Sequence, residues 1–272
     1  MKVLAIDLDG TLLHSDKTLS DYTRQTIIRM QEQGMKVVIA SGRPLQGIRP
    51  IANALQLQQH GGIVLAYNGA QIADCATGQL IYSQPMLPSS IPQLYAQAKQ
   101  NQLEILSYFN QYIISEHCEH PYVQRSMHAN KLQPMEVDDF VRTVQDIDIY
   151  KCMIVGNPDL IHQAEPKIQE QMNQTIAVFR SEPFYIECVP LGINKGVGLK
   201  RISNHLHIPL TQFTAFGDAL NDIPMLRIVG TGVAMNNANP EVKAISSAIT
   251  SSADEDGVAQ YILQMSSKNQ FK

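Results

Sequence analysis

The sequence reads Val3-Leu-Ala-Ile-Asp7-Leu-Asp9-Gly-Thr11 near its start, an apolar run that ends abruptly in two carboxylates. The run from Val3 to Ile6 is short, aliphatic and partly β-branched, which predicts a strand covered by helices on both faces. Gly10 permits a sharp turn out of this strand. Because ligands of open α/β sheets bind beyond the carboxyl ends of the strands, Asp7 and Asp9 would lie where a ligand binds.

A purely structural reading of these two aspartates is also available, because Asp is common in turns and needs no function there. Carboxylates at the end of a buried strand are costly, however, unless something positive lies beside them. Their two-residue spacing would point both side chains to one side of a strand, so their charges would crowd together without a cation or a proton. The pattern therefore favours a functional site over a simple turn.

Composition excludes several classes of protein. The 272 residues suffice for one large or two modest domains, and 44% hydrophobic with 17% charged residues argues against disorder. A net charge of −4 gives no reason to expect a nucleic-acid partner. No stretch approaches the ~20 apolar residues that cross a bilayer, and no signal peptide is expected before the first strand. The four cysteines are far apart, so we expect reduced thiols in a cytoplasmic protein, monomeric or weakly dimeric, without a membrane partner.

A parallel sheet is predicted from apolar runs that alternate with helical stretches. A helix over 21–33, with Ser20 as its N-cap, leads to a second strand that ends in Ser41-Gly42-Arg43. Such strand-helix-strand units are right-handed, which brings Ser41 to the same edge of the sheet as Asp7. The other expected core elements are strands at 35–40, 62–66, 213–216, 231–235 and 248–250, a short helix at 241–246, and a terminal helix after Gly257 followed by disorder.

Two later segments add polar groups to this edge. Asn194-Lys195-Gly196 would place a cation beside the start of a helix, an arrangement that receives phosphate oxygens well, although a single lysine is more often just solvated. Gly217-Asp218-Ala-Leu-Asn221-Asp222 follows an apolar strand and adds a second acidic turn near Asp7. Asn221 and Asp222 could instead cap the helix that begins near Pro224. Asp218 with Asp7 predicts an oxygen-rich pocket suited to Mg²⁺.

Residues 84–190 contain a different mixture of predicted helices and strands. This segment predicts a second, α+β domain inserted into a core made of 1–83 and 191–272. A predicted hairpin over 71–82, followed by Pro85 and Pro88, marks the boundary. An insertion of this kind can act as a lid. Its expected elements are helices at 90–100 and 159–172 and strands at 104–108, 112–115, 150–155, 175–179 and 184–189.

Other candidate sites in the sequence are weaker. His117-Cys118-Glu119-His120 contains zinc-ligand residue types, but its spacing matches no common structural zinc site, and the proline after His120 suggests an exposed turn. Gly196-x-Gly198 is not a dinucleotide fingerprint, because Arg201 stands where the third glycine is needed. Tyr112, Tyr122 and His128 are candidate substrate contacts in the insert, with ordinary packing as the alternative.

Read together, these segments resemble the four ordered motifs of the haloacid dehalogenase superfamily of phosphotransferases: Asp7-x-Asp9-Gly-Thr, Ser41-Gly-Arg43, Asn194-Lys195-Gly and Gly217-Asp218-x-x-Asn221-Asp222. The position and texture of the insert are similar to the Cof-type subfamily IIB with its C2B cap, and the resemblance covers nearly the full chain. It implies an α/β fold, with a Rossmann-like parallel-sheet core and an inserted α+β cap. One departure is Asn236, where relatives usually carry glycine after the methionine.

Roles for these residues follow from their chemistry. Asp7 would be the nucleophile that accepts a phosphoryl group, and Asp9, with a raised pKa, would protonate the leaving oxygen and then deprotonate water. Mg²⁺ would be held by Asp7, Asp218 and, by resemblance, the backbone carbonyl of Asp9. Resemblance also suggests that Arg43 reaches the substrate or the cap. The expected phosphate and substrate ligands are Ser41, Gly42, Arg43, Asn194, Lys195 and Asn221, with Lys195 also neutralising developing charge and Asp222 orienting Lys195 or metal-bound water.

The predicted function is Mg²⁺-dependent hydrolysis of small phosphate monoesters, such as sugar phosphates, pyridoxal phosphate or flavin mononucleotide. Three alternatives remain. A phosphomutase of the same superfamily would isomerise its substrate and need a bisphosphate activator. A phospho-accepting signalling module would form a stable phospho-Asp7 without turnover, although such modules are about half this length and need no cap. A non-catalytic sugar-phosphate sensor is the fourth reading, and the full set of charged motifs speaks against it.

Overall fold

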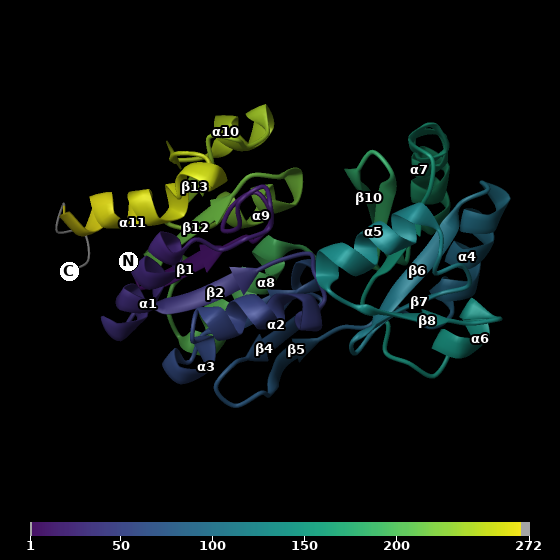
Figure 1. Ribbon diagram of the computed structural model, residues 1–272, viewed down its shortest axis with the longest axis horizontal. Helices are drawn as coiled ribbons and strands as arrows, with labels where there is room; N and C mark the ends of the chain where they lie inside the picture. The colour runs from purple at the N-terminus through teal and green to yellow at the C-terminus, as the bar shows by residue number, and fades with distance from the viewer. Residues whose placement is uncertain (1, 268–272) are drawn as a thin grey trace. The chain divides into compact units, whose positions relative to one another are not determined.

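The computed structural model describes residues 2–267, which divide into two compact units (Figure 1). One unit contains the residues up to Ser83 and those from Asn194 onward, and the other is Gln84–Ile193. The second boundary therefore lies later than the expected position after residue 190. Residues 191–193 stay with the second unit, where the Leu191 carbonyl accepts a hydrogen bond from Gln84 Nε2 at 3.3 Å. The terminal disorder that we expect falls outside the described residues.

A sheet of eight strands forms the first unit. Its strands are β1 (Val3–Ile6), β2 (Lys36–Ala40), β3 (Ile63–Ala66), β4 (Gln71–Asp74), β5 (Leu80–Ser83), β12 (Phe213–Gly217), β13 (Thr231–Ala234) and β14 (Ala248–Ile249). Their order across the sheet is β14-β13-β12-β1-β2-β3-β4-β5. Pairing is parallel from β14 to β3 and antiparallel from β3 to β5. The predicted α/β fold with a parallel-sheet core is confirmed.

Helices connect these strands. They are α1 (Asp21–Glu32), α2 (Leu45–Ala54), α3 (Leu57–His60), α8 (Lys195–Leu206), α9 (Ile223–Leu226), α10 (Pro240–Ile245) and α11 (Gly257–Ser267), of which α2 and α3 were not expected. α1 begins where the Ser20 side chain accepts a hydrogen bond from the Thr23 amide at 3.0 Å, as predicted. A methyl group at Gly196 or Gly198 would collide with Pro224 or Leu65, respectively. The two glycines therefore let α8 approach α9 and β3 closely, which explains the Gly-x-Gly pair.

The second unit is built on a sheet of six strands, β6 (Glu104–Phe109), β7 (Tyr112–Ser115), β8 (Gln133–Glu136), β9 (Cys152–Val155), β10 (Ile176–Glu182) and β11 (Tyr185–Pro190). Its order is β10-β11-β9-β6-β7-β8, antiparallel except for β7 with β8. Its helices are α4 (Ser90–Gln100), α5 (Pro121–Asn130), α6 (Phe140–Val144) and α7 (Pro158–Met172). Apolar side chains of α4, α6 and α7 share a buried cluster with β6, β7, β9, β10 and β11.

The turn expected before Pro121 is present, because the His120 amide donates to the His117 carbonyl at 3.1 Å. Pro121 itself is the first residue of α5, a helix that the sequence analysis did not predict. Proline is well suited to this position, because the first helical residue has no intrahelical use for its amide hydrogen. Across residues 2–267, no helix combines the length and apolarity that spanning a bilayer requires.

Candidate active site

The expected polar residues follow the carboxyl ends of neighbouring strands of the first unit. Asp7 follows β1, and its amide donates to the Phe216 carbonyl of β12 at 3.1 Å. Ser41 follows β2, and its amide donates to the Leu65 carbonyl of β3 at 2.9 Å. Asp218 directly follows β12. Since β12, β1, β2 and β3 are consecutive in the sheet, the strand pattern by itself brings these side chains to one edge.

Lys195 lies at the centre of this edge and is fully buried. Its Nζ donates to Asp7 Oδ1 at 2.5 Å and to Asp222 Oδ1 at 2.6 Å. Burial alone would lower the pKa of Lys195, but the charges and hydrogen bonds of Asp222 and Asp7 outweigh it and raise the pKa above its usual value. Asp222 Oδ2 also accepts the amides of Asp218 and Ala219 at 2.9 and 3.0 Å. Both oxygens of Asp222 are thus engaged by the protein.

Asp7, Asp218 and Asp222 each place a carboxylate oxygen within 4.8 Å of the others. Burial raises the pKa of Asp7 well above its usual range and that of Asp218 to about 6. One buried lysine does not balance three carboxylates, and hard oxygen ligands in such a cluster fit a divalent cation such as Mg²⁺. Gly10, at φ +81°, is required beside this cluster, because a side chain there would collide with Asp218.

Asp9 differs from the expectation. Arg43 binds it with two parallel hydrogen bonds, Nε to Oδ2 at 2.7 Å and Nη2 to Oδ1 at 2.6 Å, and Lys17 Nζ lies 2.9 Å from Oδ1. Burial raises the pKa of Asp9, but these two cations outweigh burial and bring the pKa to about 2. The prediction of a raised pKa was therefore wrong, because it considered the neighbouring carboxylates and not the two basic side chains.

The remaining predicted residues have local structural partners. Ser41 Oγ accepts the Arg43 amide at 3.1 Å, and Gly42 lies against the Asn68 side-chain amide. Asn194 caps α8 by accepting the Val197 amide at 2.9 Å. Asn221 Nδ2 donates to Asn68 Oδ1 at 3.0 Å. The contacts described here show how each residue is held within its own loop. Contact of these residues with phosphate stays a prediction.

Sequence reasoning missed two residues of this region. Thr11 is buried, and its Oγ1 donates to Asp218 Oδ1 at 2.7 Å. Its place in the Asp-x-Asp-Gly-Thr stretch was a usable signal, because Gly10 turns the chain and returns the next side chain to the strand end. Lys17, which pairs with Asp9, carried no comparable signal, since it lies in a polar loop of the sequence.

The zinc hypothesis gains no support in the second unit. His117 Nδ1 lies 2.9 Å from Glu104 Oε2, and within the described residues the aspartate cluster is the only group of metal-ligand side chains close enough to hold an ion. Among the candidate substrate contacts, the Tyr122 ring stacks on Phe184 with centroids 5.1 Å apart. His128 Nδ1 lies 2.7 Å from the Gln124 carbonyl. A role in binding substrate stays a prediction for these side chains.

Comparison with known proteins gives a consistent family. The family model of haloacid dehalogenase-like hydrolases matches residues 4–262. A haloacid dehalogenase-like hydrolase from Bacteroides thetaiotaomicron is 39% identical and superposes with a TM-score of 0.93, covering 97% of this chain and 99% of that one. The 5-amino-6-(5-phospho-D-ribitylamino)uracil phosphatase YcsE of Bacillus subtilis is 28% identical over 268 residues, 96% of this chain and 94% of the relative. A subclass IIB sugar phosphatase, at 22% identity, shares the fold with a TM-score of 0.82 over 98% of this chain and 99% of the other. The chain belongs to the family of haloacid dehalogenase-like hydrolases.

Proposed function

We propose that the protein is a Mg²⁺-dependent phosphatase that hydrolyses phosphate monoesters of small metabolites through an aspartyl phosphate on Asp7. The observation that carries this proposal is the buried Lys195 between the carboxylates of Asp7 and Asp222, with Asp218 in the same cluster. A related phosphatase with a phosphorylated ribitylamino-uracil substrate, named above, supports a small phosphate ester as the substrate class.

The metal ligands in this proposal are the carboxylates of Asp7 and Asp218 and the backbone carbonyl of Asp9. Asp222 is a weaker candidate, because Lys195 and two backbone amides already occupy its oxygens. The Asp9 carboxylate lies in the ion pair with Arg43 and is not part of the cluster. A bound Mg²⁺ would offset the repulsion between an anionic nucleophile and an anionic phosphate.

Asp7 accepts the phosphoryl group in the first half of the reaction and gives it up to water in the second, and Asp9 handles the proton in both halves. An Asp7 oxygen attacks phosphorus, the bond to the ester oxygen breaks, and Asp9 gives its proton to the leaving alcohol. Water then attacks the phosphorus of phospho-Asp7, Asp9 takes its proton, and inorganic phosphate leaves with the Asp7 carboxylate restored. Lys195 orients Asp7 and balances the negative charge that develops.

Asp9 can give a proton only after its ion pairs loosen. With Arg43 and Lys17 in place its pKa is about 2, so the paired carboxylate is ionised at neutral pH. An ionised Asp9 suits the second half-reaction, in which it accepts a proton from water. For the first half-reaction, we propose that the substrate phosphate competes with Asp9 for Arg43 and so permits protonation of Asp9. The lid role of the insert likewise stays part of the proposal.

A panel of esters assayed with Mg²⁺ and after chelation tests the function. We expect sustained release of inorganic phosphate from at least one ester among sugar phosphates, pyridoxal phosphate, flavin mononucleotide and ribitylamino-uracil phosphate, and no release after chelation. No turnover of any ester, or turnover that survives chelation, would contradict the proposal. An isomerised product without phosphate release would instead identify a mutase, and a stable phospho-Asp7 would identify a signalling module.

The pKa of Asp218 predicts how pH affects metal binding. Because its folded-state pKa, about 6, lies above the ordinary value of 3.8, this group makes the metal-free protein less stable as pH rises from 3.8 to 6. Above that range the ionised carboxylate is free to bind Mg²⁺. We expect saturating Mg²⁺ to raise the thermal midpoint by about 5 °C near pH 7.5 and by little near pH 5.

Differential scanning calorimetry with and without Mg²⁺ measures both shifts. Asp218→Asn is the control, and it should remove the Mg²⁺-dependent shift at either pH. A shift of equal size at both pH values, or one that persists in Asp218→Asn, would show that Mg²⁺ binds elsewhere.

A further inference from the structure

The loop of residues 10–20 begins directly after Asp9 and folds back over it. Asp9 and Leu13 form an isolated β-bridge, and the Lys17 amide donates to the His14 carbonyl at 2.9 Å. Lys17 adopts a left-handed conformation at φ +66°, which is uncommon for a residue other than glycine. This turn brings Lys17 Nζ to 2.9 Å from Asp9 Oδ1. The conformation of loop 10–20 therefore determines what surrounds Asp9.

Side chains from the C-terminal part of the chain hold the loop near its start and in its middle. Near its start, Asn237 Nδ2 donates to the Gly10 carbonyl at 2.8 Å, and Asn237 Oδ1 accepts the Ala253 amide at 2.9 Å. In the middle, the Ser15 amide donates to Asp254 Oδ1 at 2.7 Å. Asn236 does not have a positive φ, so it imposes no strain on the segment that presents Asn237.

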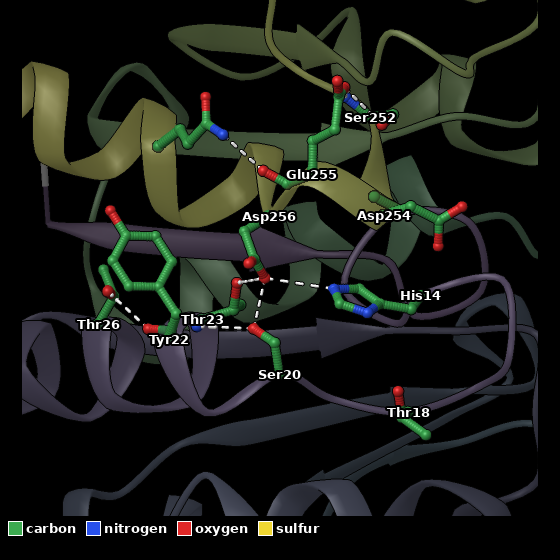
Figure 2. Close-up of polar contacts among 12 residues, drawn as sticks. His14, Thr18, Ser20, Tyr22, Thr23, Thr26, Ser252, Asp254, Glu255 and Asp256 are labelled. Atoms are coloured by element: carbon green, nitrogen blue, oxygen red, sulfur yellow. Dashed lines mark hydrogen bonds and ion pairs between the residues drawn. The ribbon is translucent and has the colours of Figure 1, made fainter.

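Asp256 holds the end of the loop (Figure 2). Its Oδ1 accepts hydrogen bonds from Ser20 Oγ and from Thr23 Oγ1, the latter at 2.7 Å, and lies 3.3 Å from His14 Nε2. Burial raises the pKa of Asp256, but these neighbours outweigh burial and lower the pKa below its usual value. The Asp256 carboxylate therefore contacts the N-cap of α1, the first turn of that helix and the His14 ring of the loop.

The segment that carries Asp256 is itself held in place. In the preceding 3₁₀ turn, η4 (Ala253–Glu255), Glu255 Oε2 accepts the Ser252 amide at 3.0 Å and the Ser252 hydroxyl at 2.6 Å. Asp256 then adopts a left-handed conformation at φ +59°, which directs the chain into α11. A rigid turn that presents a carboxylate in a conformation rare for an L-residue is suited to fixing the position of its partners.

We infer that Asp256 is a positioning residue for the phosphoryl-transfer site: it fixes loop 10–20 and thereby the surroundings of Asp9. This inference rests on the proposed function. Helix capping alone does not account for the contact, because the Ser20 side chain already accepts the Thr23 amide without Asp256. Asn237, Asp254 and Asp256 instead contact the loop at its start, middle and end, respectively. Contacts spread along the whole loop are what fixing its conformation requires.

Two esters with different leaving groups test this role. An alkyl phosphate needs a proton from Asp9 to release its alcohol, whereas the p-nitrophenolate of p-nitrophenyl phosphate leaves without one. Since kcat/KM covers the steps through release of the leaving group, we expect Asp256→Gly to lower kcat/KM for the alkyl ester about tenfold more than for the aryl ester. Glycine removes the carboxylate and tolerates the left-handed backbone.

Two further variants keep the test decisive. Asp256→Asn retains one oxygen acceptor and should give a smaller change in the same direction, even if the glycine variant is poorly folded. Glu255→Gln removes the same charge from the same turn, but its side-chain contacts are with Ser252, so it should leave the alkyl-to-aryl ratio at the parent value. An unchanged ratio in both Asp256 variants, or an equal change in Glu255→Gln, would overturn the inference.

Hydrogen exchange supplies a readout that does not require activity. In Asp256→Gly, amide hydrogens of residues 10–20 should exchange at least about tenfold faster than in the parent and in Glu255→Gln. Unchanged protection of this loop would overturn the inference. A parent protein that hydrolyses neither ester would contradict the proposed function, and the exchange measurement would still decide whether Asp256 fixes the loop.

Discussion

Replacing Asp7 by asparagine is expected to lower kcat for every phosphate ester by at least about 1,000-fold, because an amide does not serve as a phosphoryl acceptor. The fold should survive this change. Asparagine keeps the shape of the side chain and an oxygen for Lys195 Nζ, which lies 2.5 Å from Asp7 Oδ1. Burial raises the pKa of Asp7 well above its usual range, so removal of the charge also removes a desolvation cost.

Phosphate-release rates and a thermal unfolding curve in metal-free buffer separate these two effects. We expect the midpoint of Asp7→Asn to equal or exceed that of the parent at neutral pH. Asp21→Asn makes the same chemical change at an exposed carboxylate that pairs with Arg24, and it should retain full activity. Hydrolysis by Asp7→Asn at the parent rate would rule out Asp7 as the nucleophile.

Replacing Lys195 by methionine is expected to reduce the free energy of unfolding by about 3–5 kcal/mol and to abolish turnover. Methionine is close to lysine in length and removes only the positive charge and its donors. Asp7 and Asp222 would then be buried carboxylates without their shared cation, although Asp222 would keep its backbone amides. Lys195 lowers the pKa of Asp7 against the effect of burial, so without the lysine that pKa should rise further, and the loss of stability should shrink as pH falls and Asp7 becomes protonated.

Chemical denaturation at neutral and acidic pH measures this effect. Lys200→Met is the matched control, because Lys200 lies on the same helix, α8, and is exposed. That variant should lie within about 0.5 kcal/mol of the parent. The double variant Lys195→Met with Asp222→Asn should recover part of the lost stability. If Lys195→Met unfolds like Lys200→Met, the buried charge cluster does not control stability.

Elements with regular apolar patterns were predictable from the sequence. β1 was predicted at its observed bounds, because a short aliphatic run before two carboxylates allows little else. The N-cap of α1 was predicted from Ser20, since a serine before a periodic apolar stretch matches the requirement of a helix start. Strand ends in turn predicted which polar residues share an edge, because parallel pairing places them there without knowledge of side-chain contacts.

Elements that contain or begin with proline were not predicted by the same reasoning. Neither α2, which contains Pro50, nor the exposed strand β8, which contains Pro134, was predicted, and proline is uncommon in the interior of helices and strands. Pro121 begins α5, a helix that was not predicted after the turn at His120. In each case the proline is compatible both with a turn and with the observed helix or strand, and tertiary packing decides between the two.

Contacts between distant loops were beyond reach for a different reason. Asp9 pairs with Arg43 and Lys17, and Asp256 pairs with Ser20 and Thr23. In both groups at least one partner lies in an irregular segment whose path no periodic pattern fixes. The pKa of Asp9 was mispredicted because its value depends on such contacts. Electrostatic properties of a loop residue require the coordinates of its neighbours, whereas strand pairing requires only the apolar pattern.

The discontinuity of the first unit has a consequence for biosynthesis. Asp7 and Lys195 are 188 positions apart in the chain, and β1 lies between β2 and β12 in the sheet. A nascent polypeptide that ends before Lys195 therefore lacks one of the two strands flanking β1 and the buried cation beside Asp7. The continuous second unit leaves the ribosome complete while the first is still unfinished. The sheet around β1 can therefore be completed only after the whole second unit has been synthesised.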